Sequence, residues 1–167
     1  WHRLRLPLYA DLWAGGADLF HSPDFTLPPL WRARGIVTVH DLTFMHYPEC
    51  AAANLVRYLN QVVPRSIRRA RLVLADSEST RRDLVALLHV PEEKIRVVYE
   101  GAAATFQDDK DPKKIDAVRR HYGLKRPFIL YAGVWRSHKN VGGLIDAFAR
   151  MVKDLAYEGD LVITGRQ

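Results

Sequence analysis

The stretch FILYAGVWRSHKNVGGLIDAFA, residues 128–149, contains the pattern that decides the fold. With the preceding Pro127 it begins as a short apolar run, which predicts a buried strand over residues 127–132. A polar loop follows, and Asn140 is expected to cap an amphipathic helix. The apolar residues expected on the inward side of this helix are Val141, Leu144, Ile145, Phe148 and Val152. A strand followed by such a helix is typical of a parallel α/β sheet.

The same alternation of strands and helices extends along the rest of the chain. The pattern predicts further strands over residues 17–21, 35–40, 71–75, 95–99 and 160–165. It predicts further helices over residues 54–70, after a cap at Ser77 or Ser79, and after Asp111 and Pro112. Pro64 lies inside the first of these helical patterns and is expected to kink or split that helix. The expected fold class is therefore α/β with a parallel sheet.

A change in composition at residues 105–125 divides the predicted elements into two groups. We expect residues 1–104 to hold most of one α/β domain and residues 105–125 to form a linker with a short helix that ends near Gly123. Residues 126–167 are expected to begin a second domain. Because the chain starts with a loop-like stretch and no covering helix follows its last predicted strand, the sheet is expected to be truncated at both ends.

The overall composition is that of an ordinary soluble globular protein, with 48% hydrophobic and 26% charged residues. The single cysteine, Cys50, excludes an internal disulfide framework and is typical of a reducing compartment. No apolar run approaches the roughly 20 residues that span a bilayer, and the N-terminus lacks the features of a signal peptide. We therefore expect a cytoplasmic protein.

The net charge is +6, and part of it comes from a group of arginines. These are Arg65, Arg68, Arg69, Arg71, Arg81 and Arg82. A positive surface of this kind attracts phosphates, anionic lipid headgroups or nucleic acid, although arginines on exposed helices also serve only to solvate a surface. In proteins that bind single-stranded nucleic acid, aromatic residues alternate with the basic ones. They do not alternate with these arginines, so nucleic acid is not an expected partner. Peripheral contact with the inner face of an anionic membrane stays open.

Polar residues and glycines follow several of the predicted strands. In an open α/β sheet, ligands bind beyond the carboxyl ends of the strands, so these residues are the candidates for a binding cleft. They are His21, Ser22, His40, Asp41, Asp76, Ser77, Glu100, Gly101 and Gly133. Chance polar loops would give the same pattern, and the pattern therefore indicates a site without establishing it.

His40 is the best single candidate among these residues. At the end of a strand its imidazole would project into the crevice, where it can exchange hydrogen bonds with sugar hydroxyls or a phosphate. Asp41 would then either fix the ring tautomer or cap the following turn. The alternative is a histidine that is bonded only to the backbone.

The loop at residues 133–140 combines a glycine with basic side chains. Gly133 permits close approach of the backbone, and the following helix N-terminus offers unpaired N–H groups and a partial positive charge. Arg136, His138 and Lys139 add further donors before Asn140. The loop is neither a P-loop nor a Rossmann fingerprint. It predicts a pyrophosphate cradle, and a basic loop without a ligand is the alternative.

Patterns for other site chemistry are missing from the sequence. The histidines do not pair at the i, i+4 spacing of a zinc helix, so no metal site is expected. The nucleophile elbow G-x-S-x-G does not occur either.

Five blocks of the sequence resemble the retaining family 4 glycosyltransferases (group 1), in particular their mannosyltransferase-like branch. The blocks are ADLFHSPDFTLPP, TVHDLTFMHYPE, ADSESTRRDLVALLHVPEEKIRVVYEG, FILYAGVWRSHKNVGGLIDAFA and LVITG. Their order and spacing match over nearly the whole chain, whereas no single block would suffice. The resemblance implies the GT-B architecture, in which two Rossmann-like domains face each other across a cleft. The acceptor then binds mostly to the first domain, residues 1–104, and the nucleotide sugar mostly to the second.

The resemblance also implies the chemistry. It implies that a hexosyl group of the mannose or glucose type moves from a GDP- or UDP-sugar to a hydroxyl of a sugar or lipid-linked acceptor, with retained configuration and without a metal or other cofactor. Polysaccharide biosynthesis is the expected setting.

The resemblance places particular residues in this reaction. His40 matches the family's histidine near the donor sugar, and Gly133 and Lys139 match the glycine and lysine of the block that contacts the diphosphate. His138 stands where that block usually has arginine, and Arg136 lies two residues earlier, so the second phosphate contact is open between them. The family's glycine-rich loop would precede Trp1 and its paired glutamates would follow Gln167, so the chain alone is not expected to turn over the donor.

Two other functions are compatible with the same architecture. One is a GT-B sugar-nucleotide epimerase. The other is a non-catalytic GT-B remnant that acts as a binding module for a partner or a polysaccharide. Supplying donor without acceptor would reveal an epimerase, and a pure scaffold need bind neither GDP nor UDP.

Overall fold

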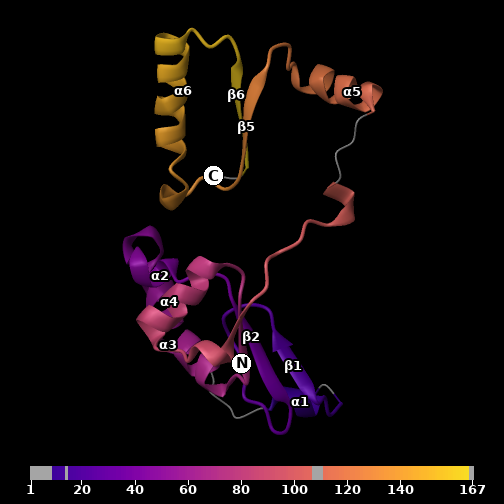
Figure 1. The fold of residues 1–167 in the computed structure, drawn as a ribbon. Coiled ribbons are helices and arrows are strands. Elements are labelled where there is room, and N and C mark those ends of the chain that lie inside the picture. The colour runs from indigo at the N-terminus through magenta and orange to yellow at the C-terminus, as the bar shows by residue number, and fades with distance from the viewer. Residues whose placement is uncertain (1–8, 14, 107–110, 166–167) are drawn as a thin grey trace. The chain divides into compact units, whose positions relative to one another are not determined.

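The computed structural model describes residues 9–13, 15–106 and 111–165. The chain forms two compact units, Trp1–Gly101 and Ala102–Gln167. Both are built on parallel strands with helices beside them (Figure 1). Residues 107–110 of the predicted linker lie outside the described residues, and the assignment of residues 105–125 as a linker stays a prediction.

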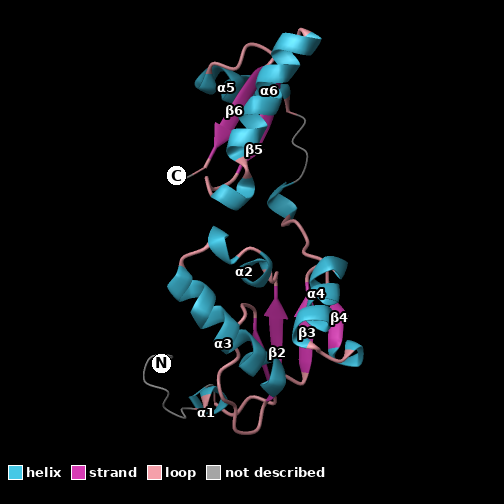
Figure 2. Ribbon diagram, turned by 90° about the vertical axis from the view of Figure 1, so that its left-hand side faces the viewer, coloured by secondary structure: helices cyan, strands magenta, loops and turns pink. Residues whose placement is uncertain are grey.

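The first unit contains a four-stranded parallel sheet in the order β1-β2-β3-β4, three strands of which are labelled in Figure 2. The strands are β1 (Leu19–Ser22), β2 (Arg34–Val39), β3 (Leu72–Ala75) and β4 (Ile95–Val97). The helices are α1 (Ala10–Trp13), α2 (Thr43–His46), α3 (Ala53–Arg69) and α4 (Glu78–Leu88), with 3₁₀ turns at Pro48–Cys50 and Glu92–Lys94. The predicted α/β class with a parallel sheet is confirmed. Because the strands run in one direction, their carboxyl ends lie along one edge of the sheet.

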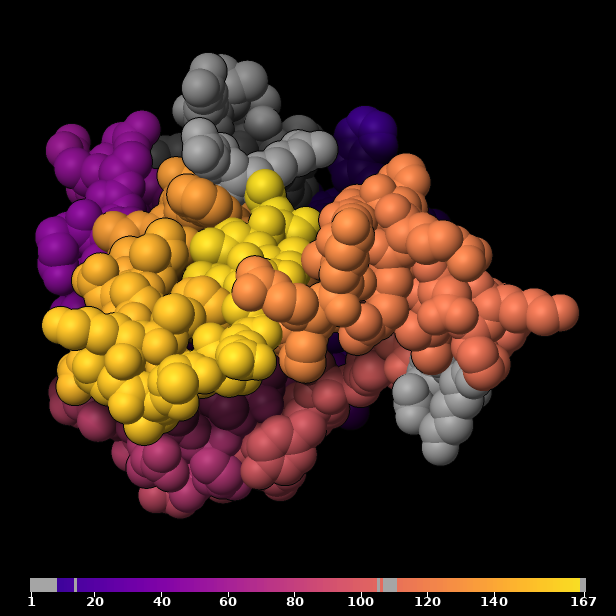
Figure 3. All heavy atoms as spheres, turned by 90° about the horizontal axis from the view of Figure 1, so that it is seen from above, coloured from indigo at the N-terminus to yellow at the C-terminus, as the bar shows by residue number. Residues whose placement is uncertain are grey.

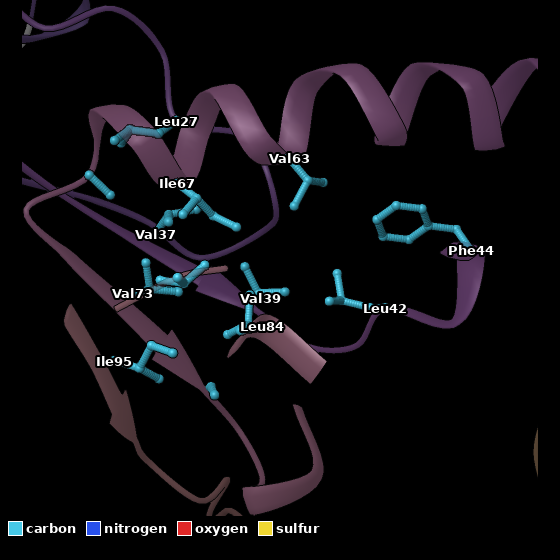
Figure 4. Packing of buried hydrophobic residues seen from close by; sticks show 13 residues of the cluster. Leu27, Val37, Val39, Leu42, Phe44, Val63, Ile67, Val73, Leu84 and Ile95 are labelled. Carbon is cyan, nitrogen blue, oxygen red and sulfur yellow. The ribbon is translucent and has the colours of Figure 1, made fainter. Parts of the chain in front are cut away.

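The hydrophobic core of this unit lies between one face of the sheet and helices α3 and α4 (Figure 4). Val37 and Val39 of β2 are fully buried, and Thr38 between them is only partly buried. In Figure 4, Val63 of α3 and Leu84 of α4 lie on the same side of the sheet as these two valines. Each such side chain contributes about 1.5–3 kcal/mol when it is fully buried. The core therefore holds the ends of β2 and β3 firmly in place.

Helix α3 is continuous across the proline in its sequence. Pro64 was expected to kink or split the helix; the split is wrong, because the α-helix runs without a break from Ala53 to Arg69, and a kink at Pro64 stays a prediction. Val63, Ser66 and Ile67 are buried on either side of the proline. Their burial against the sheet offsets the loss of one backbone hydrogen bond at Pro64, which explains why the helix is not divided.

The short helix α1, which the sequence patterns did not predict, supplies a buried carboxylate. Asp11 accepts hydrogen bonds from the backbone N–H groups of Trp31, Arg32 and Ala33 at 2.8, 2.7 and 2.9 Å. Burial works to raise the pKa of Asp11, but these three donors favour the charged carboxylate and lower the pKa to about 2. Asp11 thereby fixes the loop that leads into β2.

The second unit has two parallel strands, β5 (Phe128–Ala132) and β6 (Asp160–Thr164). Its α-helices are α5 (Pro112–Tyr122) and α6 (Val141–Leu155), and 3₁₀ turns occur at Ala104–Phe106 and Ser137–Lys139. Asp111 caps α5 with proline at the first helical position, as predicted, and Gly123 ends that helix in the left-handed conformation. In Figure 3 the gold residues of α6 and the orange residues of α5 lie on different sides of the yellow β6.

The inward side of α6 is less buried than its sequence pattern predicts. Val141 is buried, and Leu144 and Phe148 are partly buried. Ile145 and Val152, which were expected to face inward, are each 44% exposed. The prediction was wrong for these two residues because the two described strands of this unit present too narrow a sheet to cover the full apolar side of a 15-residue helix.

Two further observations complete the fold. The strand predicted over residues 95–99 ends at Val97, and Tyr99 is exposed. Among the described helices, none combines the length and the apolar character needed to cross a bilayer.

Candidate functional site

The imidazole of His40 lies directly beyond the carboxyl end of β2. Its Nε2 is 2.9 Å from the backbone carbonyl oxygen of Pro23, which follows β1. Because a carbonyl oxygen can only accept a hydrogen bond, Nε2 carries the hydrogen in this contact. The ring of Phe25 packs edge-on beside the imidazole, with ring centres 6.0 Å apart. These contacts fix the orientation of the ring from the β1 side.

Two carboxylates face the other ring nitrogen of His40. Asp76, which follows β3, places its Oδ2 3.3 Å from His40 Nδ1. Glu100, which lies beyond β4, places its Oε1 3.5 Å from the same nitrogen. Residues beyond all four strands therefore meet at one point of the sheet edge, as the parallel arrangement requires.

The surroundings of His40 favour its charged form. Partial burial works to lower the pKa of His40, but the Pro23 carbonyl, the hydrogen bond and negative charge of Asp76, and the negative charge of Glu100 all raise it. The net direction is upward from the usual histidine value. The site can therefore hold an imidazolium whose Nδ1 faces two carboxylates.

The same three residues have the chemistry of potential metal ligands. One ligand atom from each of His40, Asp76 and Glu100 lies within 4.8 Å of the others. The expectation of no metal site came from the spacing of histidines along the chain, and folding brings these three ligand types together from separate strand ends. A histidine whose second ring nitrogen donates to a backbone carbonyl is also common at metal sites. The two carboxylates suit an imidazolium equally well, so the absence of a metal stays a prediction.

Helix α4 connects to this site through its first turn. Ser77 caps the helix by accepting a hydrogen bond from the backbone N–H of Thr80 at 3.1 Å. The hydroxyl of Thr80 lies 2.8 Å from the backbone carbonyl oxygen of His40 and 3.2 Å from Oδ1 of Asp76. Ser77, a predicted cleft residue, therefore reaches the site through Thr80.

The other predicted cleft residues of the first unit lie elsewhere or make local contacts. Asp41 accepts a hydrogen bond from the backbone N–H of Thr43 at 2.8 Å and so caps the turn that begins α2. Ser22 donates to the backbone carbonyl of Thr26. His21 is bonded to the hydroxyl of Thr38. Gly101 is exposed, and a side chain at its position would meet open space.

The basic loop of the second unit has its own geometry. The N–H of Gly133 donates to the carbonyl of Thr164 at the end of β6, at 2.9 Å. Asn140 adopts the left-handed conformation, and its side chain accepts a hydrogen bond from the N–H of Gly143 at 3.2 Å. Arg136, His138 and Lys139 are exposed, and none of them forms an ion pair with another described residue. The loop therefore presents basic side chains at the start of α6 that have no ion-pair partner in the described part of the chain.

Sequence reasoning missed three parts of the site. Asp76 was named as a strand-end residue but given no role, although it follows the strand next to β2. Thr80 was not singled out, and its position three residues after the cap Ser77 is the only signal that could have found it. The carbonyl of Pro23 carries no sequence signal, because every residue has such a group. That His40 and Lys139, which belong to different units, serve one cleft stays a prediction.

A parallel α/β unit with a histidine beyond the carboxyl end of a strand is compatible with many functions, and comparison with known families defines the class. The model of the family described as Glycosyltransferase Family 4 matches residues 1–105 of this chain. The match covers more than half of the 167 residues, and the chain belongs to this family.

One curated relative is the "O-antigen chain mannosyltransferase B" of Escherichia coli. It is 26% identical over 148 residues, which cover 88% of this chain and 38% of that protein. The chain thus spans well under half the length of this relative. The predicted resemblance to family 4 glycosyltransferases is confirmed.

Proposed function

We propose that the protein containing this chain transfers a hexosyl group from a nucleoside-diphosphate sugar to an acceptor hydroxyl, with retention of configuration. The single observation that carries the proposal is the imidazole of His40, held between the carbonyl of Pro23 and the carboxylates of Asp76 and Glu100 in a family 4 chain. The named relative is a mannosyltransferase for an O-antigen chain. A mannose-type donor and a saccharide or lipid-linked saccharide acceptor are therefore the first substrates to test.

In the proposed reaction His40 binds the donor sugar. A sugar hydroxyl can take the place of the Glu100 carboxylate, which is 73% exposed and lies at the longer distance from Nδ1. Asp76 is only 22% exposed and stays with the ring. The Nδ1–H of His40 is then shared between Asp76 Oδ2 and the sugar hydroxyl, and this charge-assisted contact holds the anomeric carbon in place while the diphosphate leaves.

The leaving diphosphate needs positive charge. In the proposal Lys139 and either Arg136 or His138 supply it, together with the free N–H groups at the start of α6. Fixed donors of this kind stabilise the charge that develops as the glycosidic bond breaks. This assignment requires the loop and His40 to act on one donor molecule. Crosslinking of a photoreactive donor analogue to both units of the full-length protein would test that requirement.

The transfer itself is tested with the full-length protein, a panel of GDP- and UDP-sugars, and a saccharide acceptor. We expect retained-configuration product with one donor class, unaffected by a metal chelator, and loss of transfer in His40→Ala with nucleotide binding largely intact. Epimerised donor in the absence of acceptor would show the epimerase instead. Failure to bind any nucleotide would show a non-catalytic module, and loss of nucleotide binding in His40→Ala would mean that the residue is misplaced.

Peripheral contact with an anionic membrane is a second part of the proposal. Arg65, Arg68 and Arg69 are exposed on α3, whereas Arg81 is engaged in ion pairs with Glu78 and Glu92 at 2.7 and 2.9 Å. Each arginine near such a surface contributes about 1 kcal/mol. Co-sedimentation with anionic vesicles should fall with added salt and in the Arg65/Arg68/Arg69 triple alanine variant. If the protein does not sediment with the vesicles, or if neither salt nor the triple variant reduces its sedimentation, this part of the proposal is wrong.

A further inference from the structure

Thr80 is a buried polar residue next to the candidate site. Its residue exposure is 4%, and it belongs with Asp11, Ser22 and Ser66 to the small group of buried polar residues in the described part of the chain. Two others of this group have a clear structural purpose: Asp11 fixes a loop and Ser66 accepts a hydrogen bond from the N–H of Leu27. The side chain of Thr80 instead reaches toward the histidine at the end of β2.

The hydroxyl of Thr80 connects the ends of two neighbouring strands. It lies 2.8 Å from the carbonyl oxygen of His40, beyond β2, and 3.2 Å from Oδ1 of Asp76, beyond β3. Both partners are acceptors, so the single hydroxyl hydrogen of Thr80 is shared between them. The hydroxyl of Ser77, 2.9 Å away, is then the donor to Thr80 Oγ1. This geometry ties the Asp76 carboxylate and the His40 backbone to the same atom.

Helix capping does not account for this arrangement. The cap at Ser77 uses the backbone N–H of Thr80, which any residue other than proline would supply. If the side chain of Thr80 only filled space in the core, valine would have the same shape without a polar group that must be satisfied when it is buried. The hydroxyl therefore has a role that neither capping nor packing explains.

We propose that Thr80 is a positioning residue, whose hydroxyl holds Oδ1 of Asp76 so that Oδ2 is presented to Nδ1 of His40. The inference rests on the proposed function, in which His40 serves the donor sugar. Thr80 does not touch the substrate, since it is buried behind the two residues that it orients. Glu100, the second carboxylate at Nδ1, is far more exposed than Asp76, so Asp76 is the partner whose orientation matters.

The test compares three variants in the full-length protein. Thr80→Val removes the hydroxyl and keeps the shape, Thr80→Ser restores the hydroxyl, and Ser79→Ala removes an exposed hydroxyl from the same helical turn as the control. We expect Thr80→Val to lower kcat about tenfold with the donor KM changed less than about twofold. We expect the pKa of His40, followed by NMR of its ring, to fall in Thr80→Val and to recover in Thr80→Ser. Ser79→Ala should match the wild type in all three measurements.

Several outcomes would decide the matter. Wild-type kcat and an unchanged His40 titration in Thr80→Val would overturn the inference while leaving the proposed transfer intact. Equal losses of kcat in Thr80→Val and Thr80→Ser would also overturn it, because they would indicate packing rather than the hydroxyl. A wild-type protein that transfers no sugar, combined with a lowered His40 pKa in Thr80→Val, would reject the proposed function and support the positioning role. Should Thr80→Val not fold, Asp76→Asn replaces it, and an unchanged His40 titration in that variant would overturn the inference.

Discussion

The two units share an architecture of parallel strands and helices but differ in how much of it is buried. Every buried hydrophobic residue among the described ones belongs to the first unit, apart from Val141. The second unit leaves large apolar side chains such as Leu130 and Leu155 exposed. The same kind of fold pattern therefore produces a tight core in one unit and a thin apolar layer in the other.

This difference has a consequence for the two parts of the candidate site. In the first unit the core fixes the strand ends, so the Pro23 carbonyl and the side chains of Asp76, Thr80 and Glu100 meet around His40. In the second unit the cationic side chains are exposed, and only the backbone at Asn140 and the start of α6 is fixed. Side-chain burial thus organises the first part of the site, and helix-terminus geometry organises the second.

The largest change in the free energy of unfolding is expected for a substitution in the core of the first unit. Leu84 is fully buried, so Leu84→Ala should reduce the free energy of unfolding by about 2–5 kcal/mol through lost burial and the remaining cavity. Leu155→Ala, at a 74% exposed position on α6, is the matched control and should change it by less than about 0.5 kcal/mol. Urea unfolding measures both variants. Equal effects at the two positions would contradict the contrast between the units.

The next effect concerns the exposed loop of the second unit. Because Lys139 has no ion pair in the described structure, Lys139→Ala should leave stability nearly unchanged. If it serves the leaving diphosphate, it should raise the activation free energy of transfer by about 2–4 kcal/mol. Steady-state kinetics of the full-length protein measures this change, with Lys153→Ala, exposed in the last turn of α6, as the control. A wild-type rate in Lys139→Ala would argue against the assigned role.

A smaller difference in stability is expected between substitutions at the N-caps of α4 and α6. Ser77→Ala removes the side-chain acceptor at the start of α4 and should cost about 1 kcal/mol, whereas Ser77→Thr should cost much less because threonine keeps the capping hydroxyl. Asn140→Gly removes the corresponding acceptor at α6 but suits the left-handed backbone, so we expect only a few tenths of a kcal/mol. Thermal or urea denaturation compares them. A larger loss in Asn140→Gly than in Ser77→Ala would reverse the expected order.

The smallest effect is a pH dependence of stability from His40. Its pKa is raised in the folded protein, so its contribution is fully present below the unfolded value of about 6.5 and is lost as pH rises through the folded pKa. The stability difference between the wild type and His40→Gln should therefore shrink with rising pH over that window. Asp76→Asn should weaken the effect, since it removes one of the partners that favour the imidazolium. A difference that grows with pH would show the opposite shift.

The order and type of the main elements could be predicted because apolar periodicity and caps are local signals. Asp111 before Pro112 and Asn140 before α6 were found in this way. The continuity of α3 at Pro64 and the exposure of Ile145 could not be judged correctly, because the outcome depended on what lies opposite them in the fold. His40 could be proposed from its position after a strand. Its contacts with Asp76 and Thr80 could not, since they join residues 36 and 40 positions apart in the chain.

The amino-acid sequence by itself determined the alternation of strands and helices and the capping residues, because each depends on residue types at short spacings, and it determined the family resemblance through the order of five blocks along the chain. Only the tertiary structure decided which strand ends meet, and hence that Asp76, Glu100 and the Pro23 carbonyl surround His40. The physical reason is that pairing of parallel strands sets which distant residues become neighbours. Burial by the core then holds those neighbours at hydrogen-bonding distance.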